Sequence, residues 1–246
     1  MPEGAFRLPA WGGAADAGGG VMRPAAVLFD CDGVLADSEA VANGSIAEDL
    51  TERGWPMTME AAKETFMGTA LPDIMAAVER QLGRPLPPDW SRQIVARIVG
   101  KYRAGILDAI PGAQGAVEAV AAAGIPMAVA SNSGRDELRT KAGILPFFHH
   151  FQGRLLSFED VARPKPYPDL YIAAAKLCGA DPRDCVVIED SVAGARAGVA
   201  AGCRVLGFAH ETPALDLLEA GAAETFADHS ALPRLLGIAP VRNLIP

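Results

Sequence analysis

Two carboxylates lie two residues apart, just after the first strongly apolar run of the chain. Asp30 and Asp32 follow residues 25–29, and Gly33 comes directly after them. In open α/β sheets, ligands bind beyond the carboxyl ends of the strands. A glycine lets the chain turn at once, so that both acids can face one ligand. The simpler alternative is an acidic turn. A calcium loop of the EF-hand type fits poorly, because the positions that need glycine and glutamate hold leucine and valine.

A hydroxyl and an amide follow a second apolar run. Ser131 and Asn132 come after residues 126–130 and before a helical pattern that begins near Arg135. A hydroxyl and successive backbone N–H groups at the start of a helix suit an oxyanion. Serine and asparagine also cap helices routinely, so a plain N-cap is the alternative here.

A lysine is enclosed by prolines in the segment 163–169. Lys165 lies between two prolines, and a third proline follows at position 168. Because proline restricts its own φ and the conformation of the residue before it, the segment presents Lys165 at a fixed point. The alternative is an ordinary surface lysine in a proline-rich loop.

Two adjacent carboxylates close a third apolar run. Glu189 and Asp190 follow residues 185–188, and Ser191 comes next. Burying two acids at the end of a strand is costly unless a cation offsets their charge. Oxygen ligands suit Mg²⁺, which is usually held by one or two carboxylates and by the phosphate of a substrate. The alternative is that Asp190 or Ser191 caps the next helix.

The elements that must position these residues have a regular order. Continuous apolar runs are typical of parallel strands that are buried on both faces. Four such runs are present, at 25–29, 126–130, 185–188 and 205–208. Helical patterns that stop at a glycine occur at 115–123, 168–178 and 192–201. This alternation predicts an α/β fold with a Rossmann-like parallel sheet, and it gathers the four polar segments at one edge.

The interval 39–107 interrupts this order. Its pattern is helical, it contains no convincing buried strand, and glycines and prolines punctuate it. We expect about four helices that form an inserted all-helical cap domain, between core segments at 22–38 and 108–246. Residues 1–21 are rich in glycine and alanine and lack the charged and apolar regions of a secretory signal, so we expect a flexible lead-in. The sequence does not distinguish a native start at Met1 from one at Met22.

Composition excludes several classes of function. The chain has 246 residues, a formal net charge of −8 and four cysteines, none of them in a C-x-x-C pair. The length suits a core with a small second domain. A nucleic-acid binder would need a basic face, and no apolar run reaches the roughly 18 residues of a membrane helix. The cysteines favour small buried side chains in a reducing compartment. We therefore expect a cytoplasmic protein without nucleic-acid or membrane partners.

Taken together, the four polar segments resemble the haloacid dehalogenase-like superfamily. Within it they are similar to the branch of small-molecule phosphatases and β-phosphoglucomutase-like proteins. The resemblance covers residues 22–235, and two stretches carry it: Phe-Asp-Cys-Asp-Gly-Val-Leu-Ala-Asp-Ser-Glu from residue 29, and Val-Ile-Glu-Asp-Ser-Val-Ala-Gly from residue 187. It implies a Mg²⁺-dependent phosphatase whose partner is a small phosphate ester, with a sugar phosphate or sugar-acid phosphate as the expected substrate.

The resemblance also implies a role for each candidate residue. Asp30 is expected to attack phosphorus and form an aspartyl-phosphate, which divides one difficult displacement into two easier ones. Asp32 is expected to protonate the leaving oxygen and then to take a proton from the hydrolytic water. Ser131, Lys165 and a backbone donor at Asn132 would hold the phosphoryl oxygens.

The same resemblance implies a metal site. Mg²⁺ is expected to be held by Asp30, by the main-chain carbonyl of Asp32 and by Asp190. Glu189 would bind the ion directly or through water. Residues Thr69 and Leu71 lie in the turn that matches the specificity loop of the family, and we expect them to contact the leaving group.

Other members of the branch fit less well. Dehalogenases lack the second carboxylate that Asp32 supplies. Phosphonate-cleaving relatives form an imine on a lid lysine, and nothing around Lys63 indicates the apolar pocket that such chemistry requires. β-Phosphoglucomutases carry a histidine where Ala42 stands and an arginine in the stretch matching 68–72, where this chain has none. A phosphosugar mutase and a phosphoglycolate phosphatase remain the alternatives. The sequence fixes neither the ester nor the oligomeric state.

Overall fold

The computed structural model of the chain describes residues 23–66 and 71–238. A six-stranded sheet has the order β5-β4-β1-β6-β7-β8, and all its neighbouring strands are parallel. Its strands are β1 (Ala26–Phe29), β4 (Met127–Ala130), β5 (Leu155–Leu156), β6 (Cys185–Glu189), β7 (Arg204–Phe208) and β8 (Glu224–Phe226). The predicted α/β class is confirmed. All four predicted strands are present within one residue of their expected bounds, and the short edge strands β5 and β8 were not predicted.

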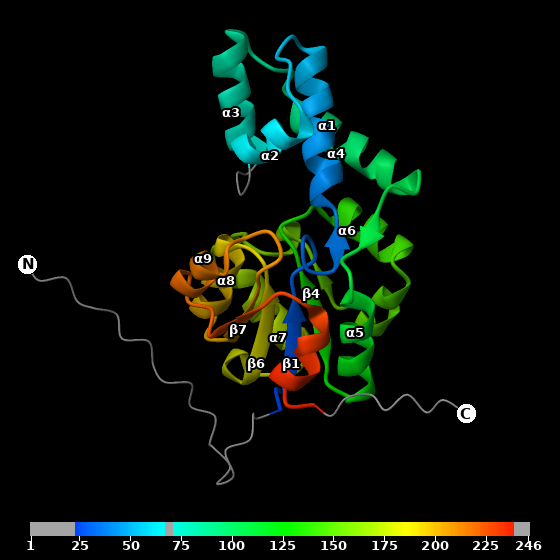
Figure 1. Cartoon of the computed structure of the whole chain (residues 1–246), viewed down its shortest axis with the longest axis vertical. Coiled ribbons are helices and arrows are strands. Elements are labelled where there is room, and N and C mark those ends of the chain that lie inside the picture. Colours follow the sequence, from blue (N-terminus) through cyan, green and yellow to red (C-terminus); the bar gives the residue numbers. More distant parts are fainter. Residues whose placement is uncertain (1–22, 67–70, 239–246) are drawn as a thin grey trace, which may run out of the picture.

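Helices cover both faces of this sheet (Figure 1). The core helices are α5 (Ala113–Ala122), α6 (Arg135–Ile144), α7 (Asp169–Leu177), α8 (Val192–Ala200), α9 (Ala214–Glu219) and α10 (Leu232–Leu235). Alternate residues of β1 pack into two different apolar clusters. Val27 and Phe29 pack in the cluster that contains α5 and α10, whereas Ala26 and Leu28 pack in the cluster that contains α7 and α8. The central strand is therefore buried on both sides, as its unbroken apolar sequence predicts.

The described part of the interval 39–107 contains four helices, and a short strand pairing lies at its borders. The helices are α1 (Glu39–Glu52), α2 (Met59–Phe66), α3 (Leu71–Leu82) and α4 (Trp90–Arg103). Strands β2 (Ala36–Asp37) and β3 (Asp108–Ala109) pair in antiparallel fashion where the chain leaves the core and returns to it. We call residues 39–107 the helical insertion. Figure 1 shows it as a separate lobe above the carboxyl ends of the sheet strands.

The helical insertion is packed around a buried tryptophan. Trp90 is fully buried, and its indole N–H donates to Asp49 Oδ2 at 2.7 Å. Arg53 holds the same carboxylate through its Nε, also to Oδ2, at 2.6 Å. A buried carboxylate with two strong donors costs far less than an unpaired one, so Asp49 ties α1 to the start of α4.

Two further expectations from the sequence concern membrane-spanning helices and the state of the cysteines. None of the helices in the described parts of the chain has the length and hydrophobicity to span a lipid bilayer. The four cysteines are free thiols, and Cys31, Cys185 and Cys203 are buried. The predicted lead-in at 1–21 lies outside the described residues.

Candidate active site

The register of the central strands brings the predicted residues together. Phe29 of β1 pairs with Val129 of β4 on one side and with Ile188 of β6 on the other. The residues that follow these strands therefore emerge side by side at one edge. The strand order reverses direction here, because the chain passes from β1 to β4 and β5 and later returns to β6 on the opposite side. Such a switch point is where open α/β sheets form a binding crevice.

Asp30 is buried at this edge, and it pairs with the lysine of the proline-rich segment. The ammonium of Lys165 donates to Asp30 Oδ1 and, at 2.7 Å, to Glu189 Oε1. Burial raises the pKa of Asp30, the charge of Lys165 lowers it, and the carboxylate of Glu189 raises it again, so that it stands at about 7. Burial lowers the pKa of Lys165, but Asp30 and Glu189 outweigh this effect and raise it. Lys165 is therefore a permanent cation beside the carboxyl group of Asp30.

Lys165 is held in place through both its backbone and its side chain. The Lys165 N–H donates to Asn132 Oδ1 at 3.0 Å, and Asn132 Nδ2 donates to the Lys165 carbonyl at 3.2 Å. The ammonium also lies 4.9 Å from the centre of the Tyr171 ring, within the range of a cation–π contact. The side chain of Asn132 thus clamps Lys165. Its expected role as a backbone donor to phosphate remains a prediction.

Asp32 accepts four hydrogen bonds. Ser38 and Lys141 donate to its Oδ1, while the hydroxyls of Ser131 and Ser133 donate to its Oδ2 at 3.1 and 2.8 Å. Burial raises the pKa of Asp32, but the charge of Lys141 and these hydrogen bonds outweigh that effect and lower it to about 2. At neutral pH the second carboxylate is therefore ionised, whereas Asp30 is near the midpoint of its titration.

Glu189 is surrounded by donors. Its Oε1 accepts from Tyr171 at 2.8 Å in addition to Lys165, and its Oε2 accepts from the Ser191 N–H at 3.0 Å and from the Ser191 hydroxyl at 2.9 Å. A Cβ added at Gly194 would overlap the same carboxylate. Ser191 caps α8 through the Gly194 N–H, as the simpler alternative predicted. Ser191 therefore does two things in one turn: it caps α8, and it donates to the carboxylate of Glu189.

Three buried carboxylates form a possible cation site. Asp30, Glu189 and Asp190 each place one oxygen within 4.8 Å of the other two. Burial raises the pKa of Asp190 well above its ordinary value, and the neighbouring carboxylates raise it further. Among the residues that the structure describes, the site with Asp32 has four carboxyl groups and two ammonium groups, those of Lys141 and Lys165. A divalent cation would balance this excess, and the all-oxygen donor set fits Mg²⁺.

Comparison with known proteins identifies the family. Residues 24–202 match the model of the haloacid dehalogenase-like hydrolase family. The chain belongs to this family. It is 32% identical over 218 residues to the 6-phosphogluconate phosphatase of Escherichia coli K12, an alignment that covers 87% of this chain and 96% of that protein. It is also 31% identical to Hexitol phosphatase A of the same organism, over 75% of this chain and 83% of the relative.

A solved structure of the family has the same fold. The hydrolase of Deinococcus radiodurans R1, determined with bound phosphate and sodium, superimposes with a TM-score of 0.73 at 32% identity, covering 89% of this chain and 99% of that one. The resemblance read from the sequence is thus confirmed. So is the enzyme class, since this haloacid dehalogenase-like hydrolase has phosphatases among its relatives.

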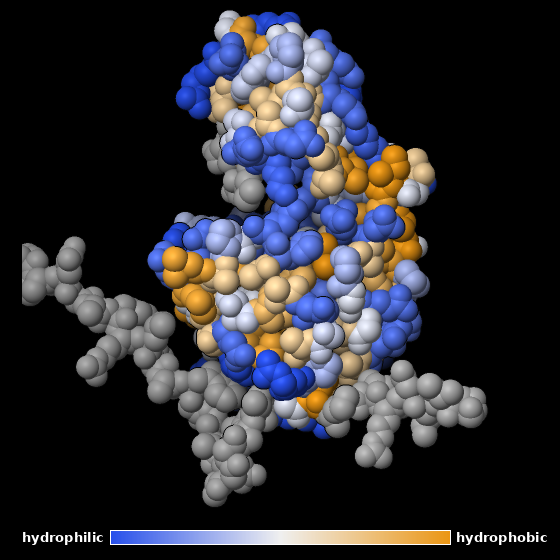
Figure 2. Space-filling model, in the orientation of Figure 1, coloured by the Kyte–Doolittle hydropathy of each residue, from blue (hydrophilic) through white to orange (hydrophobic). Residues whose placement is uncertain are grey.

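The helical insertion of this haloacid dehalogenase-like hydrolase contacts the core beside the site. Lys63 of α2 pairs at 2.6 Å with Glu211, in the loop between β7 and α9. A hydrogen bond between Glu211 and Glu39 raises the pKa of Glu39 to about 8, and burial adds to the rise. The ion pair raises the pKa of Lys63 rather than lowering it, which disfavours imine chemistry at this lysine. Figure 2 shows the surface indented between the insertion and the core.

The structure does not describe the side chains of the two residues that are expected to set specificity. Thr69 lies outside the described residues, and Leu71 begins α3 with its side chain also outside them. Their role stays a prediction.

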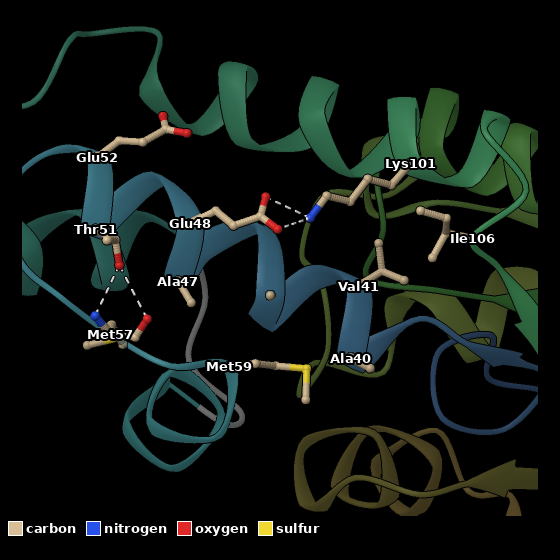
Figure 3. A pocket seen from close by; sticks show the side chains of 11 residues that line it. Ala40, Val41, Ala47, Glu48, Thr51, Glu52, Met57, Met59, Lys101 and Ile106 are labelled. Atoms are coloured by element: carbon tan, nitrogen blue, oxygen red, sulfur yellow. Dashed lines mark hydrogen bonds and ion pairs between the residues drawn. The ribbon is translucent and has the colours of Figure 1, made fainter.

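A hollow of about 730 Å³ within the insertion is separate from the carboxylate site (Figure 3). Its walls come from α1, from the start of α2 and from the end of α4, and Glu48 and Lys101 form an ion pair at 2.8 Å on its rim. No residue of the carboxylate site lines it. The hollow therefore does not form a wall of the carboxylate site.

Sequence reasoning missed four residues of the site: Ser38, Ser133, Lys141 and Tyr171. The sequence does contain a clue to Lys141, which lies three residues after Leu138 and four before Leu145, both of them buried. A lysine on the apolar face of a helix is rare unless it has a partner. Tyr171 gave no such clue, because its partner Glu189 is brought near only by the fold.

Proposed function

We propose that this protein is a Mg²⁺-dependent phosphatase that hydrolyses a small phosphorylated metabolite through an aspartyl-phosphate. A sugar phosphate or a sugar-acid phosphate is the proposed substrate, in keeping with relatives named for 6-phosphogluconate and hexitol phosphates. The observation that supports this most directly is the pairing of Asp30 with Lys165 beside Glu189 and Asp190, with Asp32 held separately by its own donors.

In the first half of the reaction, a carboxylate oxygen of Asp30 forms a bond to phosphorus while the bond between phosphorus and the ester oxygen breaks. Lys165 offsets the negative charge that gathers around the phosphoryl group. Asp32, which is ionised in the free enzyme, takes up a proton from solvent as the phosphate ester binds and passes it to the departing oxygen, so that an alcohol leaves rather than an alkoxide. The Ser131 hydroxyl donates a hydrogen bond to a phosphoryl oxygen.

In the second half, Asp32 takes a proton from a water molecule as the water oxygen attacks phosphorus. The bond between phosphorus and Asp30 breaks, which releases inorganic phosphate and restores the Asp30 carboxylate, and Asp32 returns its proton to solvent as the phosphate leaves. The same residue is thus an acid in one step and a base in the next.

The metal site of this scheme uses residues that are already close together. Asp30, Asp190 and the main-chain carbonyl of Asp32 would hold Mg²⁺, and Glu189 would contact it through water, because its own oxygens accept from Lys165, Tyr171 and Ser191. When bound, Mg²⁺ supplies positive charge that stabilises the phosphoryl oxygens and keeps Asp30 ionised. Residues 39–107 would act as the cap that covers the bound ester and excludes bulk water.

The direct test is hydrolysis of para-nitrophenyl phosphate, followed by a panel of sugar and sugar-acid phosphates ranked by kcat/KM. We expect activity with Mg²⁺, none after treatment with EDTA, and recovery when Mg²⁺ is restored. Asp30→Asn should lower kcat by several orders of magnitude, because an amide does not attack phosphorus. The exposed Asp136, replaced in the same way, is the matched control and should keep full activity.

Two results would contradict the proposal. One is full activity of the wild type in EDTA. The other is an Asp30→Asn variant within about tenfold of wild type, which corresponds to a barrier change of only about 1.4 kcal/mol.

A further inference from the structure

Lys141 is an ammonium buried inside the protein. Its side chain has no exposed surface, and three acceptors surround its Nζ: Asp32 Oδ1, Glu137 Oε1 at 2.7 Å and Ser133 Oγ at 2.9 Å. Burial lowers the pKa of Lys141, but the carboxylates of Asp32 and Glu137 outweigh this and raise it. A lysine ammonium has three N–H donors, so each of them has a partner.

This arrangement separates Lys141 from Lys165 in function. Lys165 donates to Asp30, the residue expected to react with phosphorus, whereas Lys141 donates to three other residues, none of them expected to react with phosphorus: Asp32, Ser133 and Glu137. Because all three N–H groups of the buried ammonium already have acceptors, turning toward a substrate would break hydrogen bonds without adding new ones. Lys141 therefore acts on the reaction only through Asp32.

The two oxygens of Asp32 are held differently. Oδ1 accepts from Lys141 and Ser38, neither of which belongs to the expected phosphate site. Oδ2 accepts from Ser131 and Ser133. When Ser131 turns its hydroxyl to a phosphoryl oxygen, Oδ2 keeps only the donor Ser133 and has a lone pair available for proton transfer, while Oδ1 keeps both of its donors.

A residue of the helical insertion covers the ammonium of Lys141. The Tyr102 ring, near the end of α4, lies with its centre 5.5 Å from the Lys141 ammonium, and its hydroxyl is 3.4 Å from Glu137 Oε1. Helix α4 packs on α6, the helix that carries Lys141. The low dielectric of such an environment strengthens the attraction between Lys141 and Asp32.

We propose that Lys141 is a positioning residue for proton transfer, which fixes Oδ1 of Asp32 and so aims Oδ2 at the oxygen of the leaving group. The proposal rests on the phosphatase function described above. The effect of replacing Lys141 on the rate should therefore depend on which ester is hydrolysed. An alkyl phosphate must have its leaving oxygen protonated, whereas para-nitrophenyl phosphate releases a stable phenolate that needs little help from an acid.

The experiment compares these two esters on each enzyme sample. The quantity measured is kcat/KM for the best sugar phosphate divided by kcat/KM for para-nitrophenyl phosphate. Since kcat/KM includes the step in which the ester bond breaks, the ratio reports leaving-group protonation, and because both esters are measured on one sample it does not depend on the fraction folded. General acid catalysis contributes about 10²–10⁴-fold, so we expect Lys141→Met to lower the ratio by about tenfold or more.

The controls separate this proposal from the underlying function. Asp32→Asn should lower the ratio further, and adding Lys141→Met to Asp32→Asn should change it no more, because Lys141 acts through Asp32. Lys176→Met, which replaces an exposed lysine of α7, should leave the ratio unchanged. Lys141→Gln, neutral but polar, replaces the methionine variant if that variant does not fold.

The outcomes are distinguishable. If Lys141→Met or Lys141→Gln lowers both esters by the same factor, or neither, while Asp32→Asn lowers the ratio, the role of Lys141 is wrong and the phosphatase function stands. If the wild type cleaves neither ester, the proposed function itself fails.

Discussion

The carboxylate of Asp190 occupies the space where a side chain at position 33 would lie. Gly33 has a φ of +76°, and a Cβ built on it would overlap Asp190 Oδ2. Two separate constraints thus require glycine here: a left-handed backbone, which L side chains rarely adopt, and the close approach of a proposed metal ligand. The turn after Asp32 and the position of Asp190 are consequently coupled.

Gly33→Ala should therefore damage the metal site beyond its effect on the backbone. We expect loss of Mg²⁺-dependent activity by about 10²-fold or more, since displacing a reacting group by about 1 Å costs on that order. The control is Gly105→Ala, with a φ of +86° and open space around the added Cβ, which carries the backbone strain alone. Both variants should lose about 1–3 kcal/mol of folding stability. Equal activity in the two variants would contradict the coupling between Gly33 and Asp190.

The hydroxyl of Tyr171 should matter because Glu189 is wholly buried. Tyr171→Phe removes one donor from Glu189 Oε1 and leaves Lys165 as the other. Hydrogen bonds to charged groups contribute about 1.5–3 kcal/mol, so we expect a loss of that order in the free energy of unfolding, measured by urea denaturation. Tyr167→Phe is the matched control, because Tyr167 is about half exposed and should be neutral. A loss of equal size in both variants would contradict the assigned contact.

The sequence predicts the central part of this site because each piece combines two local patterns, an apolar strand and a polar residue at its end. Asp30, Ser131 and Glu189 follow that rule. The parallel register of β4, β1 and β6 then places the ends of these strands side by side. The contacts of Asn132 could not be predicted in this way. Its side chain pairs with a backbone 33 residues away, and only the path of the chain after β5 brings the two together.

The fold was least predictable at its edges. Strands β5 and β8 are two and three residues long, too short for an apolar pattern to stand out from a loop. Lys141 was missed for a different reason. A lone lysine in a helix is normally a solvated residue, and its burial depends on Asp32, which lies 109 residues away.

The ion pair between Lys63 and Glu211 should hold the helical insertion over the core. Each single reversal, Lys63→Glu or Glu211→Lys, should lower kcat/KM for a sugar phosphate, and the double exchange should recover part of the loss. Partly exposed pairs contribute about 0.2–1 kcal/mol, so the effect should not exceed about fivefold. The pair Arg97 and Glu52 joins two helices within the insertion and is the control. If reversing that pair lowers kcat/KM equally, the contact with the core has no special role.

Stabilisation by Mg²⁺ should rise with pH, because protons compete for the same carboxylates. The pKa of Asp30 is raised to about 7 in the folded protein from an ordinary value of 3.8, and that of Asp190 is also raised. The folded state thus binds more protons than the unfolded state between about pH 4 and pH 7. In the absence of metal, these two groups make the free energy of unfolding fall as pH rises through that window. Metal binding requires the deprotonated carboxylates, so the added stability should follow the opposite course.

The size of this effect follows from linkage. At a Mg²⁺ concentration about 100 times the dissociation constant at pH 8, the metal should add about 2.7 kcal/mol. At pH 5, about two units below the pKa of Asp30, one competing proton weakens binding about 100-fold, and the same concentration should add only about 0.4 kcal/mol. The measurement is the free energy of unfolding with MgCl₂ and with NaCl at equal ionic strength, at several pH values, so that shifts common to both salts cancel. An increment that is the same at pH 5 and pH 8 would mean that Mg²⁺ does not bind at the carboxylates of Asp30 and Asp190.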